Sequence, residues 1–306
     1  MIEQKKPTVY CFGEVLWDIF PTGARAGGAP FNVAYNLMRM GVNSRMISRV
    51  GEDDLGNVLL NKVAGWNIPI ADIQRDSNYA TGTVLATIDE HNEAHYDIIA
   101  PVAWDYIEFR EDYREKIAHA DAFVFGSLVA RNEVSRNTLF ELLELAKYKV
   151  FDVNIRMPFF SLPVAKDLLA VSDMVKMNKA ELKDILDFLG KEYTYEQDGV
   201  NFVQDQFNIT EVIISKGSKG ASYYINDEHY ELPAVQVTVQ DTVGSGDSFL
   251  AGFLSKKLFG GSAEQAIKQA GALGAFITSK EGACPDYSMK DFEQFCIEKG
   301  VLPDNS

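Results

Sequence analysis

Short apolar runs alternate with longer segments of helical periodicity along most of the chain. The runs are rich in Val, Ile or Phe, which is typical of buried strands. They lie at residues 8–12, 44–50, 122–125, 150–153, 174–177 and 211–214. Between them, apolar residues recur every three or four positions at 31–40, 55–64, 138–147 and 180–189. This α/β alternation predicts a mostly parallel central sheet that is covered by helices on both faces.

Two regions depart from this alternation. Near the end of the chain, residues 248–258, 263–278 and 289–299 predict three helices in succession. In the first third, the strand-like runs 81–88 and 94–99 are joined by the polar stretch 89–93, which predicts an antiparallel hairpin. Because the hairpin lies between helical units, we expect it to project from the sheet.

The domain organisation follows from these elements. No Pro-rich or Ser-rich linker and no repeat divides the 306 residues. We therefore expect a single α/β domain over 1–306. We expect a small lid formed mainly by about 81–99, with a short contribution from about 16–26.

Composition and charge narrow the class of partner. The formal net charge of −15 argues against nucleic acid or an anionic membrane as a partner. No apolar run reaches the ~18 residues that span a bilayer, and residues 1–7 lack the apolar core of a signal peptide. Cys11, Cys284 and Cys296 show no metal-ligand spacing, which favours a reduced, cytoplasmic protein.

The strongest chemical signal is the nonapeptide Asp-Thr-Val-Gly-Ser-Gly-Asp-Ser-Phe at 241–249. A Gly-rich turn that opens a helix aims free backbone N–H groups and the positive helix end at one point, which attracts an anion. Asp247 lies at this point, where it can accept a proton from a group that attacks the anion. An anion cradle beside a carboxylate base is what phosphoryl transfer to a hydroxyl requires. The alternative is a plain turn whose aspartate caps the helix.

A second group of polar residues lies near the N-terminus. Asp18 follows the first strand, and a Gly-Gly pair at 27–28 precedes a helix that contains Asn32. Aspartate and asparagine side chains suit the vicinal hydroxyls of a sugar, and a glycine pair lets a ligand approach the backbone closely. The alternative is a turn with a helix-initiating Pro30 and an exposed aspartate.

Further candidates follow three other predicted strands. Asn178 and Glu181 form an Asn-x-x-Glu element that suits either a hydrated Mg²⁺ ion or a helix capping box. Lys216 and the glycines after it form a tight turn that would hold nucleotide phosphates or would be a solvated hairpin. Arg156 is a cation just beyond a strand end, where open α/β sheets place ligands.

Taken together and in this order, the motifs resemble the PfkB-type sugar kinases, also called the ribokinase family. Residues 26–34 and 48–56 are similar to one family signature, and 241–249 are similar to the other. The resemblance covers roughly residues 9–295. It implies a ribokinase-like three-layer α/β/α fold with a small β lid. It also implies ATP-dependent phosphorylation of the primary hydroxyl of a free monosaccharide, with Mg²⁺ and in many members a monovalent cation such as K⁺.

The resemblance also implies a role for each candidate residue. Asp247 would be the catalytic base. The backbone N–H groups of the turn that precedes Asp247 would form the anion hole, and these belong to Gly244, Ser245 and Gly246. The sugar hydroxyls would be held by Asp18, Gly28 and Asn32. Mg²⁺ and phosphate would be organised through water by Asn178 and Glu181. The nucleotide would lie along Lys216, Gly217 and Gly220, with room for adenine left by Ala270 and Gly274. The monovalent cation would lie at Asp241, Val243 and Gly282.

The wording of three segments favours one substrate. Residues 27–34 and 13–18 resemble the corresponding motifs of fructokinases. Residues 152–156 resemble their Asp-Pro-Asn-x-Arg, with Val153 in place of proline. This change leaves Asn154 available for the sugar and Arg156 for catalysis. Near the expected sugar site the chain offers Arg25 but no basic cluster, so a neutral sugar is favoured over a sugar phosphate or a sugar acid.

We therefore expect a fructokinase that makes fructose 6-phosphate. The alternative within the enzyme class is 2-keto-3-deoxygluconate kinase or another sugar kinase of the same family. The alternative of another class is a sugar-binding regulator without catalysis. By analogy with the family, we also expect a homodimer that forms through the lid.

Overall fold

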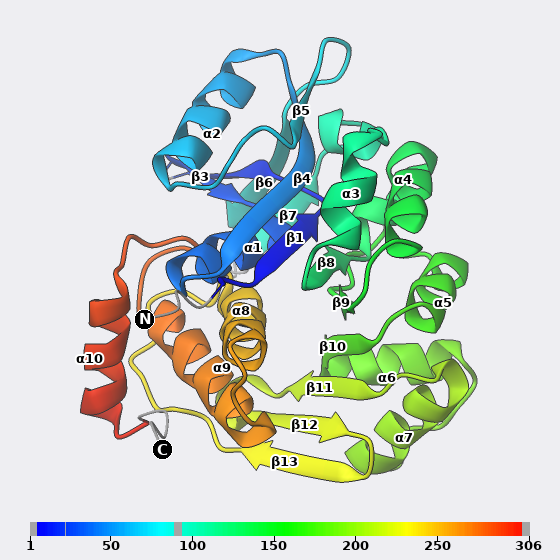
Figure 1. The fold of residues 1–306 in the computed structure, drawn as a ribbon, viewed down its shortest axis with the longest axis vertical. Coiled ribbons are helices and arrows are strands. Elements are labelled where there is room, and N and C mark those ends of the chain that lie inside the picture. The colour runs from blue at the N-terminus through cyan, green and yellow to red at the C-terminus, as the bar shows by residue number, and fades with distance from the viewer. Residues whose placement is uncertain (1–4, 22, 89–93, 302–306) are drawn as a thin grey trace.

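The computed structural model describes residues 5–21, 23–88 and 94–301. Its central sheet has nine strands in the order β13-β12-β11-β10-β9-β8-β1-β4-β5 (Figure 1). The strands from β5 to β11 pair in parallel, and β12 and β13 complete the sheet as antiparallel strands. In chain order the strands are β1 (Thr8–Phe12), β4 (Asn43–Gly51), β5 (Ile73–Asp76), β8 (Ala122–Gly126), β9 (Lys149–Asp152), β10 (Met174–Asn178), β11 (Glu211–Ser215), β12 (Ala221–Ile225) and β13 (Glu228–Leu232).

Helices cover both faces of this sheet. They are α1 (Ala29–Arg39), α2 (Asp54–Gly65), α3 (Asp112–Ala118), α4 (Glu133–Leu143), α5 (Leu162–Ala170), α6 (Lys179–Phe188), α7 (Glu196–Phe207), α8 (Ser245–Leu258), α9 (Ala263–Thr278) and α10 (Met289–Lys299). Three short 3₁₀ turns are η1 (Ala103–Tyr106), η2 (Leu128–Arg131) and η3 (Gly217–Lys219). None of the helices within the described ranges has the length and apolarity needed to cross a membrane.

Strand β1 shows why the fold has three layers. Val9 and Cys11 belong to a buried cluster that contains residues of α1, α8 and α9. Tyr10 and Phe12 point to the other face, into a cluster with residues of α3, α4, α6 and α7. Successive side chains of a strand alternate between faces, so the four buried residues that follow Thr8 in β1 require apolar cover on both sides. The predicted three-layer α/β/α architecture is confirmed.

A second, smaller sheet has the order β3-β2-β6-β7. Its strands are β2 (Leu16–Phe20), β3 (Gly23–Gly27), β6 (Gly82–Ile88) and β7 (Ala94–Ile98). The antiparallel pairing of β6 with β7 confirms the predicted hairpin, and its connection at 89–93 lies outside the described residues. Strands β2 and β3 supply half of this sheet, a larger share than the short contribution expected from 16–26. The expectation underestimated them because a hairpin needs only a two-residue turn.

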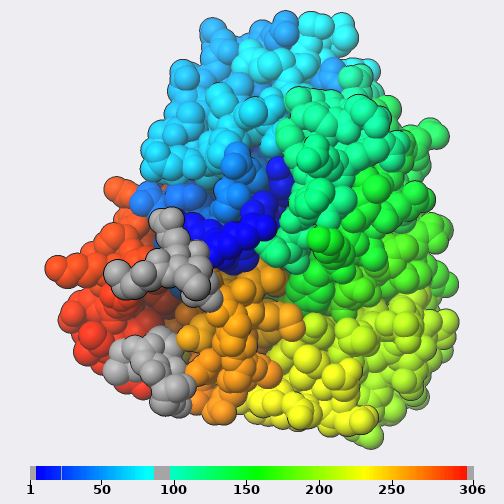
Figure 2. All heavy atoms as spheres, in the orientation of Figure 1, coloured from blue at the N-terminus to red at the C-terminus, as the bar shows by residue number. Residues whose placement is uncertain are grey.

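One predicted helix is displaced along the chain. Periodicity placed it at 138–147, whereas α4 spans Glu133–Leu143. The Oδ1 atom of Asn132 accepts a hydrogen bond from the N–H of Val134 at 2.9 Å, which caps the helix earlier than the apolar pattern begins. At the other end of the chain, α9 packs against the β12–β13 hairpin, so residues near 270 lie beside residues near 230 (Figure 2).

Candidate active site

A cavity of about 1060 Å³ opens between the small sheet and the carboxyl ends of the central strands. Asp152 of β9, Asn178 of β10 and Ser215 of β11 line it from the central sheet, and Asp18 and Val84 line it from the small sheet. Open α/β sheets bind ligands at this edge because the loops after parallel strands converge there.

The fold brings most of the predicted site residues together at this cavity. Those that line it are Asp18, Gly28, Asn32, Asn154, Arg156, Asn178, Glu181, Gly217, Gly220, Val243, Gly244, Ser245, Gly246, Asp247 and Gly274. The lining does not include Lys216, Asp241, Ala270 and Gly282. Ala270 is fully buried on α9, and a Cβ on Gly252 of α8 would approach its Cα to 3.1 Å. The distance shows that Gly252 allows the close packing of α8 on α9 at this point, and the expected room for adenine beside Ala270 stays a prediction.

The anion turn forms at the start of α8. Gly244 occupies the left-handed region at φ 74°, and a Cβ there would lie 2.3 Å from the Cβ of Ala283, so only glycine fits. The helix has no side-chain cap, and its first-turn N–H groups have no partner within the helix. Of the expected anion-hole donors, the N–H of Ser245 already bonds the carbonyl of Thr242 at 3.2 Å. This geometry favours Gly244 and Gly246 as the donors to a bound phosphoryl group.

Asp247 lies in the first turn of α8, within the cavity. Its Oδ2 atom accepts a hydrogen bond from Nδ2 of Asn32 at 2.8 Å. Burial, followed by the nearby charge of Asp152, raises the pKa of Asp247 to about 6. A carboxylate with this pKa is ionised at neutral pH and is a stronger base than an exposed aspartate.

Close backbone approach shapes the side of the cavity where the sugar is expected, which we call the sugar side. A Cβ on Gly27 would lie 2.0 Å from Oδ2 of Asp18, and a Cβ on Gly28 would lie 2.3 Å from the carbonyl oxygen of Glu14. The glycine pair is therefore required for β2 and the start of α1 to converge. Burial and the charge of Asp247 raise the pKa of Asp18 to about 6. Asn32 joins the two sides, since it lines the cavity and donates to Asp247.

Three residues of the cavity were not given a role from the sequence, namely Lys176, Asp152 and Glu14. Lys176 on β10 donates to both carboxylate oxygens of Asp152 at 2.8 Å, and its Nζ is 3.3 Å from the point that a Cβ on Gly246 would occupy. This buried cation provides positive charge beside the anion turn. A lysine inside an apolar strand run was the available signal.

Glu14 is the third missed residue. It is 3% exposed, lines the cavity, and its Oε2 atom has no hydrogen-bond partner. Burial raises the pKa of Glu14 to about 7, and hydrogen bonds from its own N–H and from that of Ala29 oppose this shift. The carboxylate therefore lies at the N-terminus of α1, which Gly28 leaves without a side-chain cap.

The Asn-x-x-Glu element forms the capping box that was one of its two interpretations. Oδ1 of Asn178 accepts from the N–H of Glu181 at 2.9 Å, and Oε2 of Glu181 accepts from the N–H of Asn178 at 2.7 Å. Oε1 of Glu181 accepts from the N–H of Ile155 at 3.0 Å. Within 5–21, 23–88 and 94–301, no group of three or more His, Cys, Asp or Glu side chains forms a metal cage. Both carboxylate oxygens of Glu181 thus accept backbone N–H groups, and a role of this element toward a hydrated Mg²⁺ ion stays a prediction.

The residues expected at the monovalent cation site meet around one carboxylate. Oδ1 of Asp241 accepts from the N–H of Val243 at 3.0 Å, and Oδ2 accepts from the N–H of Gly282 at 3.0 Å. Arg25 forms an ion pair with the same Oδ2 at 3.2 Å and a second ion pair with Glu281. Arg25 is thus bound to two carboxylates and does not contribute a free cation to the sugar side.

Known proteins are similar to this chain in sequence and in fold. Fructokinase of Klebsiella pneumoniae is 28% identical, with 92% of this chain and 97% of the relative aligned. The crystal structure of fructokinase with bound ATP from Xylella fastidiosa superposes with a TM-score of 0.86 at 22% identity, covering 97% of this chain and 100% of that chain. A fructokinase double mutant from Vibrio cholerae, bound to fructose, ADP and potassium ion, gives a TM-score of 0.81 at 22% identity and covers 94% and 98%.

The family match extends over almost the whole sequence. Residues 4–289 match the family described as "pfkB family carbohydrate kinase". The signature segments 26–34, 48–56 and 241–249 lie within this range, and the first and the last of them contribute residues to the cavity. The protein therefore belongs to the pfkB family of carbohydrate kinases.

Proposed function

We propose that the protein transfers the γ-phosphoryl group of ATP to the primary hydroxyl of free fructose and so forms fructose 6-phosphate. One observation carries the proposal: the carboxylate of Asp247 lies at the N-terminal anion turn of α8 and shares a cavity with Asp18. The base, the anion turn and the aspartate that would bind the sugar hydroxyls therefore lie in one cavity, as phosphoryl transfer to a sugar requires. The fructokinases among the relatives support fructose as the sugar.

Each residue has a defined part in the proposed reaction. Asp18, Asn32 and Asn154, beside the backbone of Gly28, bind the sugar hydroxyls and orient the primary hydroxyl toward Asp247. Asp247 accepts the proton of that hydroxyl as its oxygen attacks phosphorus. The N–H groups at the start of α8 hold the transferring phosphoryl group as charge builds on its oxygens.

Two cations of the chain assist charge balance. Lys176 lies beside Gly246, and Arg156 lines the cavity after β9. Gly217, Gly220 and Gly274 line the remaining part of the cavity, and we assign it to the nucleotide. Mg²⁺ bound with ATP would neutralise charge on the phosphate oxygens, with Asn178 and Glu181 facing its water shell. A monovalent cation such as K⁺ would bind backbone carbonyls of Asp241, Val243 and Gly282.

The charge of the cavity disfavours a sugar acid. Its acidic side chains are those of Glu14, Asp18, Asp152, Glu181 and Asp247. Its cations are those of Arg156 and Lys176, and Lys176 is already paired with Asp152. Arg25 would not be available to the carboxylate of 2-keto-3-deoxygluconate, because it is bound to Asp241 and Glu281, and Arg156 is outnumbered by the carboxylates of the cavity. A regulator without catalysis is disfavoured by the intact base and anion turn.

A substrate panel tests this proposal. Purified protein is given ATP and Mg²⁺ with free sugars and with sugar acids, and ADP release is measured. We expect the highest kcat/KM with fructose. Preferential turnover of 2-keto-3-deoxygluconate would replace the substrate, and sugar binding without ADP release from any member would support the regulator.

The Asp247→Asn variant tests the assignment of the base. We expect turnover to fall by at least ~10²-fold, because the attacking hydroxyl loses its proton acceptor. ATP and sugar affinities, measured by calorimetry, should stay close to those of the wild type. Near-normal turnover in this variant would remove Asp247 from the role of base.

We also propose a cytoplasmic homodimer that forms through the small sheet. Leu85 on β6 is 41% exposed in this sheet, and the cysteines Cys11, Cys284 and Cys296 are free thiols, which suits a reducing compartment. Light scattering of the wild type and of a Leu85→Asp variant tests the dimer. A monomeric mass for the wild type would exclude it.

A further inference from the structure

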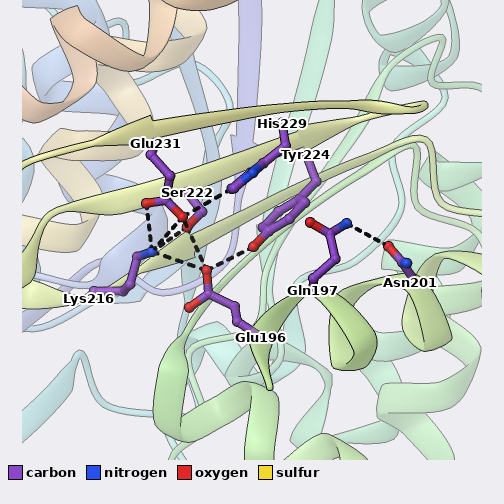
Figure 3. A network of polar contacts seen from close by, with 8 residues as sticks. All are labelled: Glu196, Gln197, Asn201, Lys216, Ser222, Tyr224, His229 and Glu231. Carbon is purple, nitrogen blue, oxygen red and sulfur yellow. Dashed lines mark hydrogen bonds and ion pairs between the residues drawn. The ribbon is translucent and has the colours of Figure 1, made fainter. Parts of the chain in front are cut away.

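Lys216 occupies a position that its place in the sequence did not indicate. It follows β11 and immediately precedes Gly217, which lines the cavity, yet Lys216 is not part of the lining, and its side chain points toward Glu196, Ser222 and Glu231 (Figure 3). Its Nζ atom is 3.1 Å from Oε1 of Glu196, 2.9 Å from Oε2 of Glu231, and hydrogen-bonded to Oγ of Ser222. An ammonium group has three hydrogen atoms, and here each has a protein acceptor. No donor is left for a nucleotide phosphate.

The acceptors belong to a network of Glu196, Lys216, Ser222 and Glu231, which we call the Lys216 cluster, and Nε2 of His229 lies 3.0 Å from Oε1 of Glu231 at its edge. Oγ of Ser222 is 2.5 Å from Oε1 of Glu196 and 2.9 Å from Oε1 of Glu231. Tyr224 donates to Glu196 at 2.9 Å, which adds a further contact from β12. The cluster therefore joins the first residue of α7 to neighbouring positions of β12 and β13, where Ser222 and Glu231 are register partners.

The turn that lines the cavity begins at the backbone of Lys216 and contacts the end of β13. The N–H of Lys216 donates to the carbonyl of Gly220 at 2.8 Å, and Gly217 and Gly220 both have positive φ. A Cβ on Gly220 would lie 1.9 Å from the carbonyl oxygen of Leu232, the residue after Glu231. Gly217, Gly220 and Leu232 line the cavity. The turn and the end of β13 thus contact the nucleotide region from one side and the Lys216 cluster from the other.

We propose that Lys216 is a positioning residue, which holds the 217–220 turn against the end of β13 and so sets nucleotide affinity without touching the nucleotide. This inference rests on the proposed nucleotide site. Its physical basis is the pairing of one cation with two carboxylates, of which Glu196 is poorly solvated: the side chains of Lys216 and Glu196 are 15% and 14% exposed, whereas that of Glu231 is 55% exposed. Without the cation, Glu196 and Glu231 repel each other, which separates α7 from β13 and displaces the turn between them.

Two methionine variants test this role. In Lys216→Met we expect the Kd of ATP and the Kd of ADP, measured by calorimetry without sugar, to rise together by roughly tenfold, or about 1.4 kcal/mol. The KM of the sugar and kcat at saturating ATP should change by less than about twofold, because Asp247 and the sugar side are untouched. Lys219→Met is the matched control. Lys219 is exposed in the same turn, does not line the cavity, and its loss removes the same charge, so nucleotide affinity should stay near that of the wild type.

A rescue variant separates repulsion from direct contact and also serves if Lys216→Met folds poorly. Lys216→Met with Glu231→Gln leaves a single carboxylate in the cluster, so we expect most of the lost affinity to return. Unchanged nucleotide affinity in Lys216→Met would overturn the proposal. A loss confined to ATP, with ADP binding retained and no rescue by Glu231→Gln, would instead indicate contact with the γ-phosphate. If the wild type binds no adenine nucleotide at all, the proposed function itself fails.

Discussion

For single residues, the main feature of the cavity is a set of carboxyl groups whose pKa is raised because they are buried. The pKa of Glu14 is raised to about 7 and those of Asp18 and Asp247 to about 6. A carboxyl group whose pKa is higher in the folded than in the unfolded state binds more protons when folded. Its ionisation therefore lowers stability, and this loss develops as pH rises from the unfolded pKa through the folded pKa. The proposed catalysis needs the ionised form of Asp247, so the proposed function and the stability of the fold favour opposite pH ranges.

The pH dependence of activity follows from the same pKa values. We expect kcat/KM to fall as pH is lowered through about 6, because Asp247 must lose its proton before it can accept one. Asp18 titrates in the same range, so the apparent pKa belongs to the two groups together. Initial rates from pH 5 to pH 8 at subsaturating sugar measure it. A flat profile down to pH 5 would contradict a buried carboxylate base.

The stability of a Glu14→Gln variant isolates the unfavourable charge. Glutamine keeps an oxygen for the N–H of Ala29 and cannot ionise, so the variant should melt at a higher temperature than the wild type at pH 8.5. At pH 5, where Glu14 is protonated in the folded protein, the two melting temperatures should converge. Calorimetric melting at both pH values measures the difference. An equal difference at both would mean that packing, not ionisation, distinguishes the variants.

At the scale of elements, the sequence predicted those whose pattern is local. The apolar runs of β1, β4, β8, β9, β10 and β11 and the periodicity of α9 and α10 are found where expected. The helices α3, α5 and α7 and the strand β5 were not predicted, since each is short or largely polar and is stabilised by its neighbours in the fold.

The site shows the same division. The anion turn and the glycine pair were predicted, because the residues of each motif follow one another in the sequence. Lys176 and Asp152 lie on different strands and meet only through the parallel pairing of β9 with β10, so no local pattern could place them beside Gly246. Lys216 illustrates the converse. The tight turn that begins at Lys216 was predicted, but the direction of the Lys216 side chain depends on its contacts with α7 and β13.

A pair of glycine variants tests the start of α8 as an element. Gly244 and Gly190 both have φ 74°, so alanine imposes the same backbone strain of about 1–2 kcal/mol at either site. At Gly244 the new Cβ would also lie 2.3 Å from the Cβ of Ala283, whereas nothing lies within 4 Å at Gly190. We expect Gly244→Ala to lower kcat by more than ~10²-fold, because the donors at the start of α8 are displaced. Gly190→Ala should lose stability but keep kcat. Equal kcat in both variants would show that the anion turn is not needed.

At the scale of the whole molecule, the charge opposes the proposed cosubstrate. The net charge of −15 and the excess of carboxylates over cations in the cavity both repel a nucleotide phosphate. Favourable contacts with Lys176, Arg156 and the start of α8 act only within the cavity. Approach and binding thus respond to different parts of the charge distribution: the overall field governs approach, and the local cations govern the bound state.

Ionic strength separates these contributions. Screening shortens the Debye length from about 30 Å at 0.01 M to about 8 Å at 0.15 M, which suppresses the long-range repulsion before it weakens contacts inside the cavity. We therefore expect kcat/KM for ATP to rise several-fold over this range of salt. Fructose is neutral, so its kcat/KM at saturating ATP should stay constant, which makes the second substrate an internal control. Tetramethylammonium chloride avoids any specific effect of K⁺. A fall in kcat/KM for ATP would mean that Lys176 and Arg156 dominate the field during approach.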